Sequence, residues 1–229
     1  MTPHTPLIVH HLNNSRSQRI LWLLEELGLP YDIVRYQRNP QTMLAPPELR
    51  RVHPLGKSPV VTVDGLTLAE SGAIIETLVE RYANGRLSPP PGTDEVVRYR
   101  YWLHYAEGSA MPPLLLKLVF GRIGQAKMPF FARPVAKAIV AKTMSSFIQP
   151  QIGQHLAFME GELQGRDWFV GPDFTAADIQ MSFPLEAAHA RGGLTAQTHP
   201  RLTDWLARIH ARPAYLRAIE RGGEYALMK

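Results

Sequence analysis

The chain has 229 residues, of which 45% are hydrophobic, so it is long enough to bury the core of one large domain or two small ones. Lys and Arg number 25 against 20 Asp and Glu, which gives a formal net charge of +5. Cysteine is absent, which excludes disulfides, Cys-ligated metals, iron–sulfur clusters and a thiol nucleophile belonging to the protein. Any thiol chemistry must therefore use a thiol that another molecule supplies.

The sequence predicts a soluble, cytoplasmic protein. Residues 1–9 contain two prolines and no long apolar segment of the kind found in signal peptides, and no run of about 18 apolar residues follows. The basic residues are scattered, and the densest group, Arg98 and Arg100, falls in a helical pattern. A solvated helix face explains this group better than a nucleic-acid partner does. A charge of +5 suits substrates that carry carboxylates equally well.

The first part of the chain alternates strand and helix signals. Residues 7–12 are apolar and partly β-branched, which predicts a strand, and residues 31–36 predict a second one. Between them, apolar residues recur at i, i+3, i+4 and i+7 from Ile20, which predicts a helix that ends at Gly28. A strand–helix–strand unit of this length implies a parallel pair with a right-handed crossover.

A hairpin and a helix complete this part. A short helical stretch is expected near residues 47–51. Residues 59–63 and 66–69 then flank Asp64-Gly65, a strong signal for a two-residue hairpin turn. Residues 71–82 have helical spacing. The predicted order is βαβ, a short α, then ββα.

The proline-rich stretch at 85–93 predicts a linker, because it can continue neither a helix nor a central strand. We therefore expect a domain over 1–84, the linker over 85–93 and a helical domain over 94–229. In the helical domain, Pro112-Pro113 should bend or interrupt a helix over 94–118. Further prolines punctuate the next helical region, which resumes over 148–163.

Three local motifs carry chemical possibilities. Ser15 follows the first strand and precedes the first helix, where the helix dipole and free N–H groups favour negative charge; a simple helix cap explains it equally well. Glu70-Ser71 opens a later helix and leaves the same two readings open. The peptide bond before Pro59 is a candidate for the cis form, although most such bonds are trans.

Two other motifs are set aside. Residues 56–58 match the Gly-Lys-Ser ending of a phosphate-binding loop, but Arg51 occupies the position where that loop needs a glycine. His10 and His11 would face opposite sides of a strand and could not easily grip one ion, so no metal site is predicted.

Together, these pieces resemble the cytosolic glutathione transferases of the serine type. The resemblance spans the whole chain. Its most specific pieces are Gly56-Lys57-Ser58-Pro59 and Glu70-Ser71, with Ser15 four residues before Arg19. Segments 107–114, 128–130 and 178–185 are similar to the Gtt-type subgroup of fungi, which also has bacterial members.

The resemblance implies a thioredoxin-like, glutathione-binding N-terminal domain and a helical C-terminal domain that helps to form the second-substrate pocket. In this family the serine after the first strand donates a hydrogen bond to the glutathione thiolate, and Ser15 holds that position. The thiolate attacks an electrophilic carbon or a peroxide oxygen. An ordinary thiol has a pKa of about 8.5, and a hydroxyl donor with a helix N-terminus can lower it by about one to two units. Asn14 and Ser17 are alternatives to Ser15 as the residue that contacts the thiolate.

The resemblance also assigns roles to other residues. It implies a cis Pro59 that presents the backbone of Val60 to the cysteinyl part of glutathione. The residues that it implies for the remainder of glutathione are Glu70 and Ser71 for the γ-glutamyl group, and Lys57, with His53 close by, for the glycyl carboxylate.

Further expectations concern the second half of the chain. Asn13, Tyr105 and Met111 are candidates for the second-substrate pocket, although helix spacing makes each of them a candidate for the core as well. Thr175 and Asp178 match the helix cap of the family and are assigned to folding. The resemblance further suggests a homodimer with no nucleic-acid or membrane partner. The competing interpretations are a non-catalytic binding or regulatory module of the same fold, and a basic nucleic-acid-associated protein.

Overall fold

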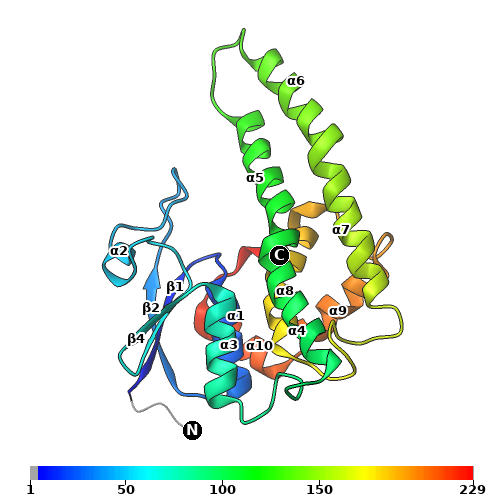
Figure 1. Ribbon diagram of the computed structural model, residues 1–229. Helices are drawn as coiled ribbons and strands as arrows, with labels where there is room; N and C mark the ends of the chain where they lie inside the picture. The colour runs from blue at the N-terminus through cyan, green and yellow to red at the C-terminus, as the bar shows by residue number, and fades with distance from the viewer. Residues whose placement is uncertain (1–4, 229) are drawn as a thin grey trace.

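The computed structural model describes residues 5–228, so residues 1–4 and 229 of the expected domains lie outside the described residues. The N-terminal half contains β1 (Leu7–Leu12), α1 (Ser17–Leu27), β2 (Tyr31–Tyr36), α2 (Leu49–Val52), β3 (Val60–Val63), β4 (Leu66–Ala69) and α3 (Ser71–Tyr82). The C-terminal half contains α4 (Asp94–Tyr105), η1 (Ala106–Ala110), α5 (Met111–Gln125), α6 (Arg133–Thr143), η2 (Met144–Ile148), α7 (Gln149–Glu162), α8 (Ala176–Ala187), η3 (Ala188–Gly192), α9 (Pro200–His210), α10 (Pro213–Gly222) and η4 (Ala226–Met228). The chain thus has a thioredoxin-like half followed by a helical half, and the predicted fold class is confirmed (Figure 1).

The N-terminal half is built on a four-stranded sheet with the strand order β2-β1-β3-β4. β1 and β2 are parallel, whereas β3 is antiparallel to both β1 and β4. The predicted strand–helix–strand unit and the predicted hairpin are therefore confirmed. Asp64 and Gly65 at the hairpin turn have φ of 49° and 77°, the pair of positive values that a two-residue type I′ turn requires.

Helix α1 lies between the sheet and the helical half. It ends at Gly28, whose φ of 68° is the left-handed cap that glycine adopts readily. Neighbouring elements α3, α8 and α10 all contact it, and nine of its residues are buried. α10 approaches α1 so closely at Gly222 that an added Cβ there would lie 2.6 Å from the Oε1 atom of Gln18. The last long helix of the chain thus covers the first.

The helical half begins with α4, η1 and α5, which follow one another without a loop. The predicted interruption is present as η1, one π-helical segment that precedes the two prolines. Pro112 and Pro113 directly follow η1, so the change to π-helical hydrogen bonding comes just before the two residues that lack an N–H. α5 and α6 then run side by side and extend beyond the rest of the molecule (Figure 1).

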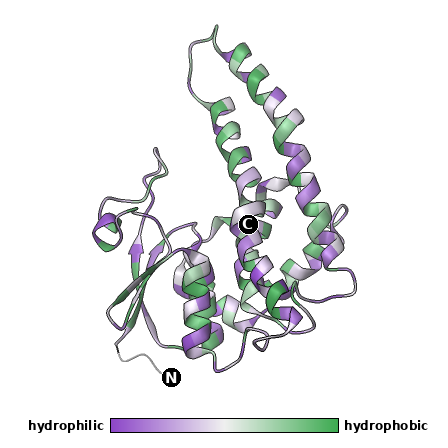
Figure 2. Cartoon of the chain, in the orientation of Figure 1, coloured by the Kyte–Doolittle hydropathy of each residue, from purple (hydrophilic) through white to green (hydrophobic). Residues whose placement is uncertain are grey.

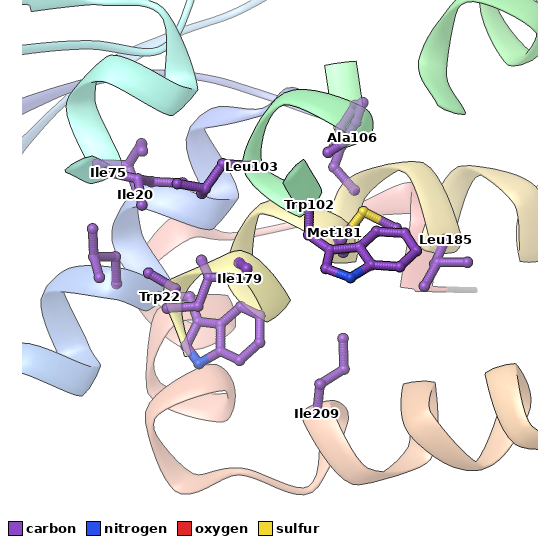
Figure 3. Packing of buried hydrophobic residues seen from close by; sticks show 14 of the residues in the cluster. Ile20, Trp22, Ile75, Trp102, Leu103, Ala106, Ile179, Met181, Leu185 and Ile209 are labelled. Carbon is purple, nitrogen blue, oxygen red and sulfur yellow. The ribbon is translucent and has the colours of Figure 1, made fainter. Parts of the chain in front are cut away.

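One hydrophobic core joins the two halves. Its buried side chains come from β1, α1 and α3 as well as from α4, α7, α8 and α9. Figure 3 shows residues of this cluster from both halves, with Ile20 and Ile75 on one side and Trp102 and Met181 on the other. Because apolar surface is buried continuously across the boundary, the halves form one packed unit.

The start of α8 has the geometry of a helix cap. The backbone N–H of Thr175 donates to Oδ2 of Asp178 at 3.0 Å, and Oδ1 of Asp178 accepts from the Phe169 N–H at 3.0 Å and the Trp205 indole at 3.2 Å. Asp178 is fully buried, and this burial raises the pKa of its carboxyl to about 6 despite these donors. The two residues therefore lie in the core of the helical half.

Candidate active site

A cavity of about 300 Å³ lies where the edge of the N-terminal half meets η1. Its walls come from four places: the residue before α1, the segment between α2 and β3, the junction of β4 with α3, and η1. The residues that line it are Arg16, His53, Leu55, Lys57, Ser58, Pro59, Ala69, Glu70, Ser71 and Glu107. Five of the predicted site residues (His53, Lys57, Pro59, Glu70 and Ser71) are thus brought together in one hollow.

Ser15 lies next to this cavity and is 3% exposed. Its hydroxyl oxygen is 3.5 Å from that of Ser58, which is on the cavity wall, and 2.8 Å from that of Ser17. Ser17 is fully buried, while the Oδ1 of Asn14 accepts the Ala226 N–H at 2.6 Å. Of the three candidates for contact with a thiolate, Ser15 is therefore the one with a hydroxyl beside a cavity residue.

The sequence predicts free N–H groups at the start of α1, but its first amides are already hydrogen-bonded to Ser15. The N–H of Ser17 donates to the Ser15 hydroxyl oxygen at 3.2 Å, and the N–H of Gln18 donates to the Ser15 carbonyl. Ser15, the residue before the N-cap Arg16, thus accepts from the first N–H of α1 and borders the cavity at once. The positive end of the helix acts on the cavity through the hydroxyl group, which accepts from the helix and retains its own proton to donate.

The junction of β4 with α3 presents Glu70 and Ser71 to the cavity. Glu70 has φ of 68°, a conformation that residues other than glycine rarely adopt and that clusters at active sites and ligand sites. The Ser71 hydroxyl accepts from Arg19 at 3.0 Å. Because the first N–H groups of a helix have no acceptor within it, the start of α3 offers donors to a carboxylate.

A chain of charges connects this junction to the helical half. Arg19, 1% exposed, donates to the carboxylate of Glu107, to Ser71 and to the Gln180 carbonyl. Glu107 also accepts from Nε of Arg16, with both oxygens 2.9 Å away. Burial favours a raised pKa for the Glu107 carboxyl, but Arg19 and Arg16 outweigh it and hold that pKa below its usual value.

The π-helical segment places Glu107 in the cavity. η1 carries Glu107 where α4 gives way to α5, and such insertions in a helix occur frequently at functional sites. Glu107, Arg16, Ser58 and Leu55 line the cavity without having been predicted as site residues. The partners Arg16 and Glu107 are 91 positions apart, so no local pattern could have paired them.

The segment before β3 contributes the remaining wall. The peptide bond between Ser58 and Pro59 is cis, as the resemblance implied. Ser58 and Pro59 line the cavity, whereas Val60 is fully buried, pairs with His10 and Ala69, and does not line it. The position of Val60 therefore does not support the expected contact between its backbone and the cysteinyl part of glutathione. The backbone of Ser58 is better placed for that contact.

The three candidates for the second-substrate pocket do not line the cavity either. Asn13 uses its side chain and carbonyl to accept from Arg38 at 2.8 and 3.3 Å. The Tyr105 hydroxyl is 2.6 Å from Nδ1 of His155, and Met111 is 7% exposed at the start of α5. Their contact with a second substrate stays a prediction.

A larger hollow lies on the α4–α7 face. Its volume is about 580 Å³, and it contains none of the predicted site residues; the residues that line it are Asp94, Val97, Arg98, Tyr101, Phe158 and Glu162. Within residues 5–228, no group of three His, Asp or Glu side chains is arranged to hold a metal ion. No helix in the same range is long and apolar enough to cross a membrane.

Comparison with known proteins identifies the family. Residues 15–81 match the model of the glutathione S-transferase N-terminal domain, and residues 127–213 match that of the C-terminal domain. The chain is 36% identical to glutathione S-transferase 3 of Schizosaccharomyces pombe over 94% of its own length and 87% of that protein. The chain belongs to the glutathione S-transferase family.

Other glutathione S-transferases support this placement. Glutathione S-transferase 1 of Saccharomyces cerevisiae is 33% identical over 94% of this chain and 95% of that protein. A crystal structure of a glutathione S-transferase from Actinobacillus pleuropneumoniae superposes with a TM-score of 0.80 at 35% identity, covering 97% of this chain and 96% of that one. The resemblance drawn from the sequence, including its fungal and bacterial members, is confirmed.

Proposed function

We propose that the chain catalyses attack of the glutathione thiolate on an electrophilic second substrate, with Ser15 donating a hydrogen bond to the sulfur. A carbon–sulfur bond forms and the leaving group departs, or the sulfur adds to an activated double bond. The observation that carries the proposal is a buried hydroxyl at a helix N-terminus beside a cavity with two cationic and two anionic side chains.

The charges of the cavity match those of glutathione, which carries one ammonium group and two carboxylates. The start of α3 and the Ser71 hydroxyl suit the γ-glutamyl carboxylate, while Glu70 suits the ammonium. Lys57, with His53 nearby, suits the glycyl carboxylate. In place of Val60, we assign the backbone of Ser58, next to the cis proline, to the cysteinyl part, because Ser58 lines the cavity and Val60 lies inside the sheet.

A hydroxyl donor stabilises the thiolate more than the thiol, and so lowers the pKa of bound glutathione. A shift of one unit corresponds to about 1.4 kcal/mol. We assign one to two units to Ser15 together with the end of α1. The same thiolate can attack a hydroperoxide: the sulfur bonds to the terminal oxygen as the O–O bond breaks, and the departing alkoxide takes up a proton to give the alcohol. A second glutathione thiol then condenses with the resulting sulfenic acid to give glutathione disulfide and water.

Thiolate titration of Ser15→Ala tests the role of the hydroxyl. We expect the pKa of bound glutathione, followed by the ultraviolet absorbance of the thiolate, to rise by about one to two units. The matched control is Ser182→Ala, which removes an equally buried hydroxyl that donates to the Ile179 carbonyl of its own helix. An unchanged titration in Ser15→Ala would refute the assignment.

Retention on immobilised glutathione, followed by assays with aryl halides, enones and hydroperoxides, tests the activity itself. Turnover of any of these classes supports the transferase, and their relative rates separate conjugation from peroxidase activity. The non-catalytic binding module predicts no retention and no turnover. It is not favoured, because the relatives that match over nearly the whole chain are transferases.

We also propose a homodimer, placed in the cytoplasm. Figure 2 shows hydrophobic residues along the extended arm of α5 and α6, and Phe130 and Phe131 at its tip are 81% and 70% exposed. Contiguous exposed apolar patches mark interaction sites in soluble proteins. Light scattering of the purified chain tests the dimer, and a monomer at assay concentration would contradict it.

A further inference from the structure

Behind Ser15, a buried chain of polar side chains runs away from the cavity. The Ser15 hydroxyl oxygen is 2.8 Å from that of Ser17, which is 2.9 Å from Nδ1 of His11 on β1. All three side chains are at most 5% exposed, so bulk water does not compete for these hydrogen bonds. The orientation of each proton is therefore set by the hydrogen bonds among these three side chains.

We propose that His11 and Ser17 are positioning residues, which hold the Ser15 proton toward the glutathione sulfur when His11 carries its proton on Nδ1. This inference rests on the proposed role of Ser15 as the donor to the thiolate. It adds two residues that touch neither glutathione nor the second substrate.

The direction of the chain follows from counting protons. A serine hydroxyl has one proton to donate and can accept from others. Ser15 already accepts from the Ser17 N–H at 3.2 Å. The Ser58 hydroxyl donates to the His10 carbonyl at 3.0 Å, so its proton is used on the strand. The short contact between Ser15 and Ser17 then requires one of these two hydroxyls to donate to the other.

Two arrangements satisfy that requirement. If Nδ1 of His11 is an acceptor, Ser17 donates to it, and Ser15 must donate to Ser17, away from the cavity. If Nδ1 carries a proton, it donates to Ser17, and Ser17 donates to Ser15. The proton of Ser15 is then free to point to the cavity wall at Ser58. The Leu12 carbonyl, 3.4 Å from Ser17, is the weaker acceptor in either case.

A thiolate selects the second arrangement, because it accepts hydrogen bonds and donates none. Burial, together with the field of Arg35 on β2, lowers the pKa of His11 to about 4, so its ring carries a single proton at neutral pH. The ring also has the Gly222 carbonyl at the end of α10 as a hydrogen-bond partner. The single ring proton can therefore be donated either to the Gly222 carbonyl or to the Ser17 hydroxyl, and thiolate binding favours donation to Ser17.

Pairs of variants at Ser17 and His11 distinguish a role in positioning the Ser15 proton from a role in the stability of the fold. Ser17→Ala and His11→Leu break the series of hydrogen bonds behind Ser15. Because the bond that Ser15 accepts from Ser17 orients and polarises its hydroxyl, we expect each substitution to raise the pKa of bound glutathione by about one unit, with a roughly tenfold loss of thiolate below that pKa. Ser17→Thr keeps the hydroxyl, and His11→Asn places an amide donor close to the Nδ1 position. In both of these variants the pKa of bound glutathione should stay within a few tenths of a unit of its value in the unmodified protein.

The matched control is His10→Asn. His10 is the neighbouring residue of β1, similarly buried, but its Nδ1 is 3.0 Å from the Tyr36 hydroxyl and it does not belong to the chain. We expect its thiolate titration to be unchanged. Ser15→Ala is measured alongside. If it raises the thiol pKa while Ser17→Ala and His11→Leu do not, the positioning role is wrong and the role of Ser15 stands. If Ser15→Ala leaves the thiol pKa unchanged, the proposed role of Ser15 as the donor to the thiolate is wrong.

A second measurement needs no variant and so does not depend on how well one folds. Nitrogen-15 chemical shifts of the His11 ring distinguish a proton on Nδ1 from one on Nε2. We expect glutathione to move the population toward the Nδ1–H form, whereas a product analogue without a free thiolate should not. An Nε2–H ring with glutathione bound at a pH where the thiol is ionised would overturn the inference.

Discussion

Removing the Glu107 carboxylate should destabilise the protein far more than removing an exposed acidic residue. Arg19 is 1% exposed, and Glu107 is its charged partner. Glu107→Ala leaves the guanidinium buried with the Ser71 hydroxyl and the Gln180 carbonyl as its acceptors. Breaking a buried ion pair at one partner typically costs about 3–5 kcal/mol. We take the lower end, about 3 kcal/mol, because the Glu107 side chain is 31% exposed and water can enter the space that it leaves.

Urea unfolding at fixed protein concentration measures this loss, and thermal unfolding should show a decrease in Tm of about 6–12 °C for a chain of this size. Glu162→Ala is the matched control, because its pair with Arg98 is about a quarter exposed on both sides and should contribute no more than about 1 kcal/mol. In an Arg19→Met background the buried charge is gone, so Glu107→Ala should then cost less than about 1 kcal/mol.

The double-mutant cycle therefore predicts a coupling of at least about 2 kcal/mol between Arg19 and Glu107. A loss in Glu107→Ala as small as that in Glu162→Ala would refute the reasoning. So would equal losses in the two Arg19 backgrounds, because they would show that the charge of Arg19 does not depend on this carboxylate.

Three further predictions concern pH and packing. The pKa of His11 is about 4 in the folded chain and 6.5 in the unfolded one, so stability should fall as the pH drops from 6.5 to 4, by on the order of 3 kcal/mol. Acid unfolding of His11→Asn, in which this group no longer titrates, should lack that part of the loss. Asp178→Ala leaves the Trp205 indole and two buried backbone N–H groups without their acceptor, and should cost about 3 kcal/mol in urea unfolding. A cost below about 1 kcal/mol would show that this cap is not needed. Gly222→Ala places a methyl group 2.6 Å from a side-chain oxygen of α1 and should cost about 1–3 kcal/mol, whereas Gly153→Ala meets no atom within 4 Å and should stabilise α7 by about 0.5–1 kcal/mol. Equal effects of the two substitutions on Tm would contradict the close packing of α10.

Local signals were enough to predict the N-terminal half. The strand–helix–strand unit, the Asp64-Gly65 turn and the helix end at Gly28 depend on periodicity and turn chemistry within a few residues. The prolines of the second half were harder to interpret. They were expected to interrupt helices, yet Pro134 lies in the first turn of α6, where proline is well tolerated. Pro150 directly follows the π-helical segment η2 within the continuous run from α6 to α7.

The cavity was predictable in part. Motif resemblance identified His53, Lys57, Pro59, Glu70 and Ser71, because these residues stand in short segments with fixed spacing. Residues that reach the cavity through tertiary packing were not predicted by motif resemblance. Glu107 needs the π-helical segment together with Arg19 of α1 and Arg16 just before it, and the hydrogen bonds from Ser15 to His11 need α1 to lie against β1. Neither set of contacts produces a recognisable pattern in the spacing of residues along the sequence.

The packing of α10 on α1 has a consequence for the order of events during protein synthesis. The ribosome makes α1 among the first residues and α10 among the last, so the apolar face of α1 that meets α10 stays uncovered until nearly the whole chain has emerged. The sheet and its hairpin can pair early, but the segment that carries Ser15 is completed last. A ribosome stalled before residue 213 should therefore hold a nascent chain that is prone to aggregation and open to proteases at α1.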